Sequence, residues 1–318
     1  MRKNLFRLLW ILLLAALLYW ALKNAPLTEI WSTLRQLQLW QIAALIGINA
    51  GIYALVTLRW WIITQAEAKR VPYLPLLAVR VAVFGVSYFT LGPQVGGEPL
   101  QVLALRQRYG LTYTRAASTV LMDKLLEFLA NFILLAFGLT ATLEAGILST
   151  NGGQPILSLI GFVILLMWPP IHILLLRRGR YPVSAFLRAL PKTKATRFIA
   201  ASEWMAGAFC RRHFNALIAA ALVSLLAAAG MLGEYFLMTS FLNVELSAPQ
   251  TVAAWTAGWL AFLVPWPGGL GALEASQVFA LGAFGVTAAS AIGVTLLIRA
   301  RDLLIGGLGL AFASRGVK

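Results

Sequence analysis

The sequence predicts an all-α protein that crosses a membrane several times, and three observations support this prediction. Of the 318 residues, 60% are hydrophobic and only 12% are charged, whereas about a quarter of the residues in a soluble domain are charged. Several apolar segments approach or exceed about 18 residues, the length that spans a bilayer as a helix. The alternating segments of about ten residues that are typical of a transmembrane β-barrel are absent from the sequence.

Six segments are predicted to cross the membrane as full helices. They are residues 5–22, 39–64, 119–143, 155–176, 214–242 and 288–313. The first follows a basic N-terminus, is long and lacks a clean small-residue cleavage site, so an uncleaved anchor is favoured over a signal peptide. We expect a single domain over residues 1–318, with a first half of about 1–176, a basic loop at 177–213 and a second half at 214–318.

The charges of the loops predict an orientation. Residues 177–213 hold nine Lys and Arg against one acidic residue, whereas the loops 144–154 and 243–250 contain neither Lys nor Arg. Basic loops stay in the cytoplasm, so we expect both termini inside, in the plasma (inner) membrane of a prokaryote. The net charge of +15 then favours anionic lipid at the basic loop as a partner, and argues against nucleic acid. Within this loop, residues 194–214 are expected to form an interfacial helix or a solvated connector.

Two clusters of proline and glycine interrupt apolar runs. The first cluster is Pro93, Gly96 and Gly97, and the second is Pro265, Pro267, Gly268, Gly269 and Gly271. Both contain the spacing P-x-x-G-G, and a glutamate follows each. Such breaks at membrane depth are tolerated where the freed backbone lines a cavity or is buried in protein. They are also the best sequence indication of the binding site of a transporter.

In the scheme with six spans, the first broken segment enters the membrane from the cytoplasm and the second from outside. We therefore expect two re-entrant helical hairpins that belong to an inverted repeat. If the segments 74–91 and 99–109 both cross fully, the number of spans becomes eight and the orientation is unchanged.

Charged residues inside the apolar segments are the candidate substrate-binding residues, because such side chains are costly in a bilayer and usually functional. They are Glu98, Arg106, Asp123, Glu127, Glu274, Arg299, Arg301 and Asp302. Glu98 and Glu274 are expected in the first turns of short helices, where a carboxylate either caps the helix or meets a cationic group or a proton. Arginine suits the geometry of a phosphate.

Local spacing predicts some of the pairing among these charges. Lys124 and Glu127 are three residues apart and can form an ion pair. Arg299 and Asp302 are expected to share one face of a helix, with Arg301 pointing elsewhere. Glu234, in the middle of a predicted span, has no local partner and is expected to face the protein interior.

No catalytic, metal-binding or cofactor motif is found in the sequence. The single cysteine, Cys210, and the two histidines, His172 and His213, are not spaced as metal ligands. We therefore expect no catalytic residue, no metal and no cofactor. The one acidic pair that could serve a metal-dependent transferase is Asp123 with Glu127.

The chain resembles the membrane domain of lysylphosphatidylglycerol synthases and related stand-alone flippase-like proteins. The resemblance rests on Pro267, Gly269, Gly271 and Glu274 followed by Arg299, and on Gly96, Gly97 and Glu98 followed by Arg106 and the helix that holds Asp123 and Glu127. It implies a helical membrane fold with paired re-entrant segments and the translocation of lipid between leaflets. Because the sequence ends shortly after the last predicted span, we expect a stand-alone form that lacks the soluble aminoacyl-transferase domain.

The leading functional hypothesis is a lipid flippase that works by alternating access around the two broken segments. It would move a polar-headgroup phospholipid or a lipid-linked substrate, and a homo-oligomer is left open. Two alternatives are an integral membrane transferase that acts on lipid-linked substrates, and a non-catalytic scaffold for a partner in lipid or envelope biosynthesis.

Overall fold

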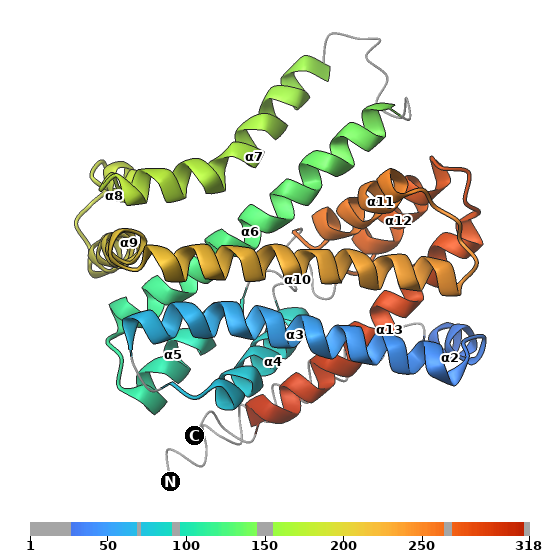
Figure 1. Ribbon diagram of the computed structural model, residues 1–318, viewed down its shortest axis with the longest axis horizontal. Coiled ribbons are helices and arrows are strands. Elements are labelled where there is room, and N and C mark those ends of the chain that lie inside the picture. Colours follow the sequence, from blue (N-terminus) through green and yellow to red (C-terminus); the bar gives the residue numbers. More distant parts are fainter. Residues whose placement is uncertain (1–26, 69–70, 91–95, 145–154, 264–268, 315–318) are drawn as a thin grey trace. The chain divides into compact units, whose positions relative to one another are not determined.

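The computed structural model describes residues 27–68, 71–90, 96–144, 155–263 and 269–314. The predicted span 5–22 and the residues Pro93, Pro265, Pro267 and Gly268 lie outside these ranges. Within them the secondary structure is helical and contains no strand, which confirms the all-α class. The helices are α2 (Leu27–Arg35), α3 (Leu39–Glu67), α4 (Tyr73–Phe89), α5 (Glu98–Tyr109), α6 (Tyr113–Glu144), α7 (Pro155–Arg177), α8 (Pro182–Leu187), α9 (Lys194–Arg212), α10 (Phe214–Phe241), α11 (Ala248–Ala261), α12 (Ala272–Gly282) and α13 (Ala288–Ser314), as Figure 1 shows.

The same order of helices occurs twice along the chain. Helices α3 to α6 have 29, 17, 12 and 32 residues, and helices α10 to α13 have 28, 14, 11 and 27 residues. Each series is therefore long, short, short, long, and each predicted proline–glycine break falls between its two short helices. We refer to α3–α6 as the first series and to α10–α13 as the second series.

Two of the described helices, α3 and α10, are long and apolar enough to cross a membrane, and α4 is a shorter apolar helix. Three more helices, α6, α7 and α13, contain the predicted spans 119–143, 155–176 and 288–313. Each of these helices also includes charged residues. The number of spans stays a prediction.

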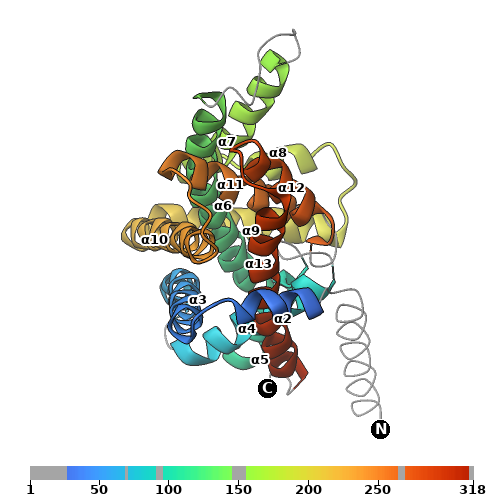
Figure 2. The same ribbon diagram turned by 90° about the vertical axis from the view of Figure 1, so that its right-hand side faces the viewer.

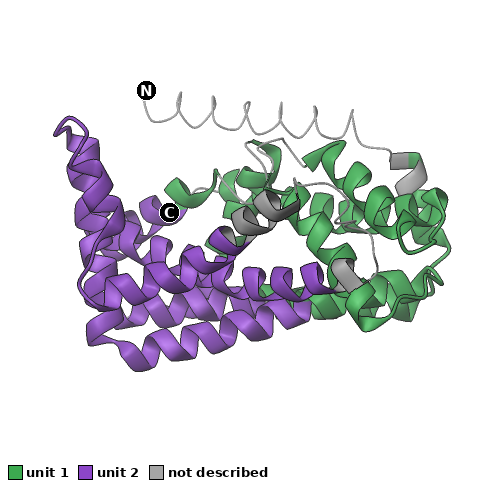
Figure 3. Cartoon of the chain, turned by 90° about the horizontal axis from the view of Figure 1, so that it is seen from above, with its two compact units in different colours: residues 1–53, 77–100, 231–318 green, residues 54–76, 101–230 purple. Residues whose placement is uncertain are grey.

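The chain divides into two compact units, which Figure 3 shows in green and purple. Unit 1 consists of Met1–Tyr53, Leu77–Leu100 and Met231–Lys318. Unit 2 consists of Ala54–Leu76 and Gln101–Gly230. Neither unit is a sequential half of the chain, because helices such as α3 and α10 contribute residues to both.

Helices α3 and α10 lie side by side (Figures 1 and 2), and the contacts within the two units are those of an antiparallel pair. In unit 1 the start of α3 contacts the end of α10, since the ring centroids of Trp40 and Phe241 lie 5.3 Å apart. In unit 2 the end of α3 meets the start of α10, since Ile63 and Leu217 belong to one buried cluster.

In unit 1, the backbones of α4 and α13 approach each other closely at glycines. A Cβ atom added to Gly85 would lie 2.6 Å from the carbonyl oxygen of Gly306, and one added to Gly309 would overlap the backbone of α4. Glycine is therefore required here, as is common where membrane helices pack tightly. Phe89 and Leu310 fill the adjacent buried cluster, which fixes α13 and the charged residues on it.

In unit 2, helix α6 packs against α7 and α9. Helix α9 corresponds to the helix predicted over residues 194–214, and the side chains of Thr193 and Thr196 cap its start. Phe209 of α9 is buried in the protein core with Met122 and Leu176, whereas Phe198 and Trp204 are exposed. One side of α9 is thus occupied by protein, and only the other side is free to meet lipid or solvent.

The only cysteine of the chain, Cys210, gives a direct test of this packing. Burial raises the pKa of its thiol to about 12, outweighing the opposite effect of Arg211 and Arg177. Because the thiolate is the reactive form, we expect maleimide at pH 8 to label the native protein at least about a hundredfold more slowly than the denaturant-unfolded protein, in which a cysteine has a pKa of about 8.5. The raised pKa also means that the contribution of this group to stability falls as the pH rises from about 8.5 towards 12. Equal labelling rates in the two states would contradict the packing of α9.

Candidate functional site

The second break ends in two glycines that turn the chain into α12. Gly269 and Gly271 have φ angles of 61° and 78°, in the left-handed region that glycine adopts at little cost. Helix α12 then begins at Ala272, and the backbone N–H of Gly271 donates a hydrogen bond of 2.9 Å to Oε2 of Glu274. The prediction that Glu274 lies in the first turn of a short helix is confirmed.

Glu274 also forms an ion pair with Arg299 of α13. Oε1 of Glu274 accepts a hydrogen bond from Nε of Arg299, and Nη2 of Arg299 donates to the carbonyl oxygen of Gly269 at 3.4 Å. The side chain of Arg299 is 3% exposed and that of Glu274 is 34% exposed. The pair therefore consists of a buried cation that holds the break in place and a carboxylate that is open on one side.

A second cluster in unit 1 gives Glu234 the partner that local spacing did not predict. Oε2 of Glu234 accepts a hydrogen bond of 2.7 Å from Nη1 of Arg301, and Nδ2 of Asn49 donates to Oε1 at 3.0 Å. Arg301 also donates from Nε to Oδ1 of Asp302 at 2.8 Å. The expectation that Arg301 points away from Asp302 was wrong, because its long side chain reaches back to the carboxylate of its neighbour.

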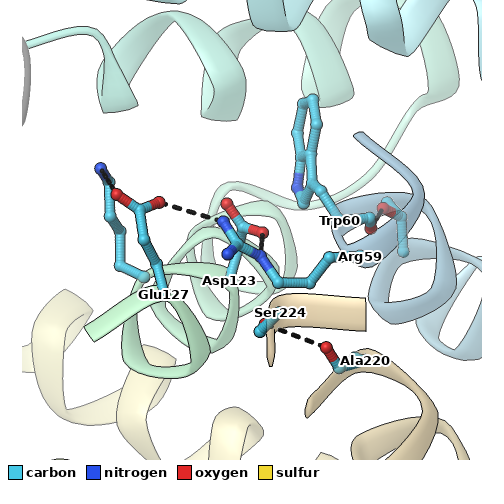
Figure 4. A network of polar contacts seen from close by, with 8 residues as sticks. Arg59, Trp60, Asp123, Glu127, Ala220 and Ser224 are labelled. Atoms are coloured by element: carbon cyan, nitrogen blue, oxygen red, sulfur yellow. Dashed lines mark hydrogen bonds and ion pairs between the residues drawn. The ribbon is translucent and has the colours of Figure 1, made fainter. Parts of the chain in front are cut away.

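Unit 2 contains a comparable buried cluster, shown in Figure 4. Nε of Arg59 lies 2.6 Å from Oδ1 of Asp123, and Nη2 lies 3.0 Å from Oε2 of Glu127. Nζ of Lys124 lies 3.3 Å from Oε1 of Glu127, which confirms the predicted local pair. Sequence reasoning missed Arg59, although a cation near the end of an apolar helix is itself a signal of a buried partner.

The first break has a similar ending, but its predicted residues do not all come together. The backbone N–H of Gly96 donates to Oε2 of Glu98 at 2.8 Å, so Glu98 binds the backbone at the start of α5 in unit 1. Arg106 lies in unit 2, where it donates to the carbonyl oxygen of Leu111 at 3.3 Å and its guanidinium lies 4.8 Å from the ring centroid of Tyr113. The structure places Glu98 and Arg106 in different units and gives each a local contact.

The candidate residues thus fall into two groups. Unit 1 holds the pair of Glu274 with Arg299, the neighbouring Arg301 and Asp302, and Glu98. Unit 2 holds Arg106, Asp123 and Glu127. Within the described part of the chain, no group of three or more His, Cys, Asp or Glu side chains is placed to hold a metal ion.

A known protein family matches most of the chain. Neither a curated protein nor a solved structure matches the chain. The family described as the lysylphosphatidylglycerol synthase TM region matches residues 7–309, which include both breaks and every candidate residue. The chain therefore belongs to the family of lysylphosphatidylglycerol synthase transmembrane regions and is a membrane protein.

Proposed function

We propose that this protein is a transporter that moves a lipid with a polar headgroup between the two leaflets of a membrane. The family indicates a membrane protein in lipid metabolism or transport. The observation that supports transport is the pair of Glu274 and Arg299 at the glycine break before α12. It combines both signs of charge, a turn built from left-handed glycines and a carboxylate that is partly accessible.

The chemistry of this pair suits an amphiphile that carries a phosphate. The guanidinium of Arg299 can exchange its bond to Glu274 for a bond to a phosphate oxygen, because carboxylate and phosphate offer it similar acceptor geometry. Glu274 is then available to a cationic part of the headgroup. The backbone at the start of α12 adds N–H donors to the anion site. Binding and release of the headgroup therefore require only that Arg299 exchanges Glu274 for the phosphate and back again.

The proposed transport cycle is alternating access about an inverted repeat with six full spans, two re-entrant hairpins and both termini in the cytoplasm of a prokaryote. The repeated order of helices and the antiparallel arrangement of α3 and α10 support this. The sequence contains no nucleotide-binding motif, so we propose that an ion gradient or the lipid gradient itself drives the movement.

The transferase alternative depended on Asp123 and Glu127 as acid–base groups or metal ligands. Both carboxylates are engaged by Arg59, and Glu127 is also engaged by Lys124. Two carboxylates neutralised in this way are poor ligands for Mg²⁺, which prefers unpaired oxygen donors and water. This arrangement favours a structural role for the cluster, and we propose that the protein is not an enzyme.

The test is a leaflet-exchange assay with purified protein in liposomes. The liposomes carry trace fluorescent lipids of three kinds, zwitterionic, aminoacylated and anionic, and a membrane-impermeant quencher reports the fraction in the outer leaflet. We expect the protein to expose inner-leaflet lipid of at least one kind, while protein-free liposomes keep about half of it protected. If no kind of lipid is exposed faster than in protein-free liposomes, the proposed function is wrong.

A further inference from the structure

The two series of helices keep an almost constant register. The first residues of α10, α11, α12 and α13 follow those of α3, α4, α5 and α6 by 175, 175, 174 and 175 positions (214 − 39, 248 − 73, 272 − 98 and 288 − 113). Residues of the buried ion pairs fall in the same register, with the sign of the charge exchanged at one position and kept at another. Arg59 corresponds to Glu234, and Glu127, which binds Arg59, corresponds to Asp302, which together with Glu234 binds Arg301.

Each short helix after a break contains the sequence E-x-x-Q. In α5 the residues are Glu98 and Gln101, and in α12 they are Glu274 and Gln277, 176 positions later. Both glutamines are buried, with exposed fractions of 1% and 0%. A buried amide needs hydrogen-bond partners, but the two glutamines differ in theirs.

Both polar atoms of the Gln277 side chain have a hydrogen-bond partner, and they attach α12 to its neighbours in unit 1. The hydroxyl of Tyr235 in α10 donates to Oε1 of Gln277 at 2.6 Å, and Nε2 of Gln277 donates to the carbonyl oxygen of Ala254 in α11 at 2.9 Å. A single amide thereby ties the helix that follows the break to both helices that precede it.

Gln101 lacks these bonds. Neither Nε2 nor Oε1 of Gln101 has a hydrogen-bond partner among the described residues of the chain. In the register of the repeat, Tyr235 corresponds to Trp60 in α3, and Nε1 of Trp60 is likewise buried and without a partner in this part of the structure. Trp60 and Gln101 both belong to unit 2. The first series therefore holds a donor and an acceptor at the positions that correspond to Tyr235 and Gln277, and neither has a partner in the described part of the chain.

We propose that Gln101 and Gln277 are positioning residues that are engaged alternately during transport. In the state described here, Gln277 is bonded to Tyr235, and Gln101 is released. In the opposite state Gln101 binds the indole N–H of Trp60, and Gln277 is released. This inference rests on the proposed alternating access, in which an inverted repeat exchanges the conformations of its two halves. The left-handed glycines Gly96 and Gly269 supply the points about which α5 and α12 turn.

The decisive experiment measures hydrogen exchange of α5 (residues 98–109) and α12 (residues 272–282) in purified Gln101→Leu and Gln277→Leu. Each substitution removes the bond of one state and so favours the other. Gln101→Leu is expected to slow the exchange of α12 by about fivefold, the population change that one net hydrogen bond produces. Gln277→Leu is expected to slow the exchange of α5 by up to the same factor, and by less where the state with Gln101 released is the more populated one. A substitution in one series thus protects, from hydrogen exchange, the short helix that follows the break in the other series.

Thr256→Val is the matched control. The hydroxyl of Thr256 in α11 is also buried without a partner in the described structure, but it has no part in the proposed exchange. Its removal is expected to leave the exchange of α5 unchanged. Faster exchange of both helices in Gln277→Leu, or a change confined to the substituted helix, would overturn the proposal, since simple loosening gives those patterns.

A transport measurement separates the failure of this proposal from that of the proposed function. Trp60→Phe and Gln101→Leu are each expected to slow leaflet exchange, and the double variant is expected to be no slower than either single variant because they remove one bond. If each substitution slows hydrogen exchange in the other series but the protein moves no lipid, the proposed function is refuted, and the alternating engagement of Gln101 and Gln277 is supported. If Gln101→Leu moves lipid at the wild-type rate, the alternating engagement of the two glutamines is refuted, and the proposed function is supported.

Discussion

Replacing Arg59 by leucine is expected to lower the free energy of unfolding by about 3–5 kcal/mol, because it leaves buried carboxylates without their cation. The side chains of Arg59 and Asp123 are 2% and 0% exposed, so bulk water does not screen the carboxylate that loses its cation. The loss is measured as a decrease in the thermal unfolding midpoint of the protein in lipid nanodiscs. A substitution at an exposed cation such as Arg188 is expected to change the midpoint little.

A second substitution shows whether the cost arises from the unpaired charge. Replacing Arg59 and Asp123 together by leucine removes both charges, and an apolar replacement of a buried ion pair is often close to neutral. We therefore expect the double variant to be more stable than Arg59→Leu alone. Glu127→Gln is expected to cost less than Arg59→Leu, because Glu127 is partly exposed and retains Lys124 nearby. If the loss of stability in the double variant equals the sum of the losses in Arg59→Leu and Asp123→Leu measured separately, packing and not charge explains the effect.

The fold class, the positions of the two breaks and the starts of α5 and α12 could be predicted from the sequence. Each depends on a local cause: an apolar composition, a proline or glycine that interrupts a helix, or a carboxylate in the first turn. Glu98 and Glu274 bind backbone N–H groups where the local pattern placed them. The pair of Lys124 and Glu127 was also predictable, because its members are one helical turn apart.

The partners of the buried charges could not be predicted in the same way. Arg59 and Asp123 are 64 residues apart, and Glu234 and Arg301 are 67 residues apart. Nothing in the spacing of one helix determines which other helix packs against it. The membrane alters only the requirement for a partner, since a charge in hydrocarbon must be neutralised, and the packing of α3, α6, α10 and α13 decides which partner is used.

Uncharged polar residues were harder still to interpret from the sequence. Gln101 and Gln277 lie in short helices where a glutamine is equally typical of a solvated surface, and only their burial and their bonds distinguish them. The packing of Phe209 against α6 and α7 was missed for a similar reason. An aromatic residue on an amphipathic helix gives the same pattern whether it faces lipid or protein.

Glu274→Gln is expected to reduce leaflet exchange by about ten- to a hundredfold, because it weakens a charge-assisted hydrogen bond worth about 1.5–3 kcal/mol. This substitution separates the two roles that the sequence suggested for Glu274. Glutamine keeps an oxygen that accepts the hydrogen bond from Gly271, so the cap on α12 is preserved while the charge is lost. If capping is the sole role, Glu274→Gln transports lipid at the wild-type rate. Glu98→Gln, at the equivalent cap of α5, is the matched comparison.

Arg299→Ala tests the other member of the pair and is expected to stop exchange altogether. It removes the cation that holds Gly269 and would meet a phosphate, so both the geometry of the break and the anion site are lost. The reciprocal exchange, Glu274→Arg with Arg299→Glu, restores an ion pair and is expected to recover thermal stability without recovering transport. The buried position would then carry a carboxylate, which repels a phosphate, and the partly exposed position would carry the cation. Recovery of both stability and transport would mean that the pair serves only to hold α12 against α13, and the headgroup site would have to lie elsewhere.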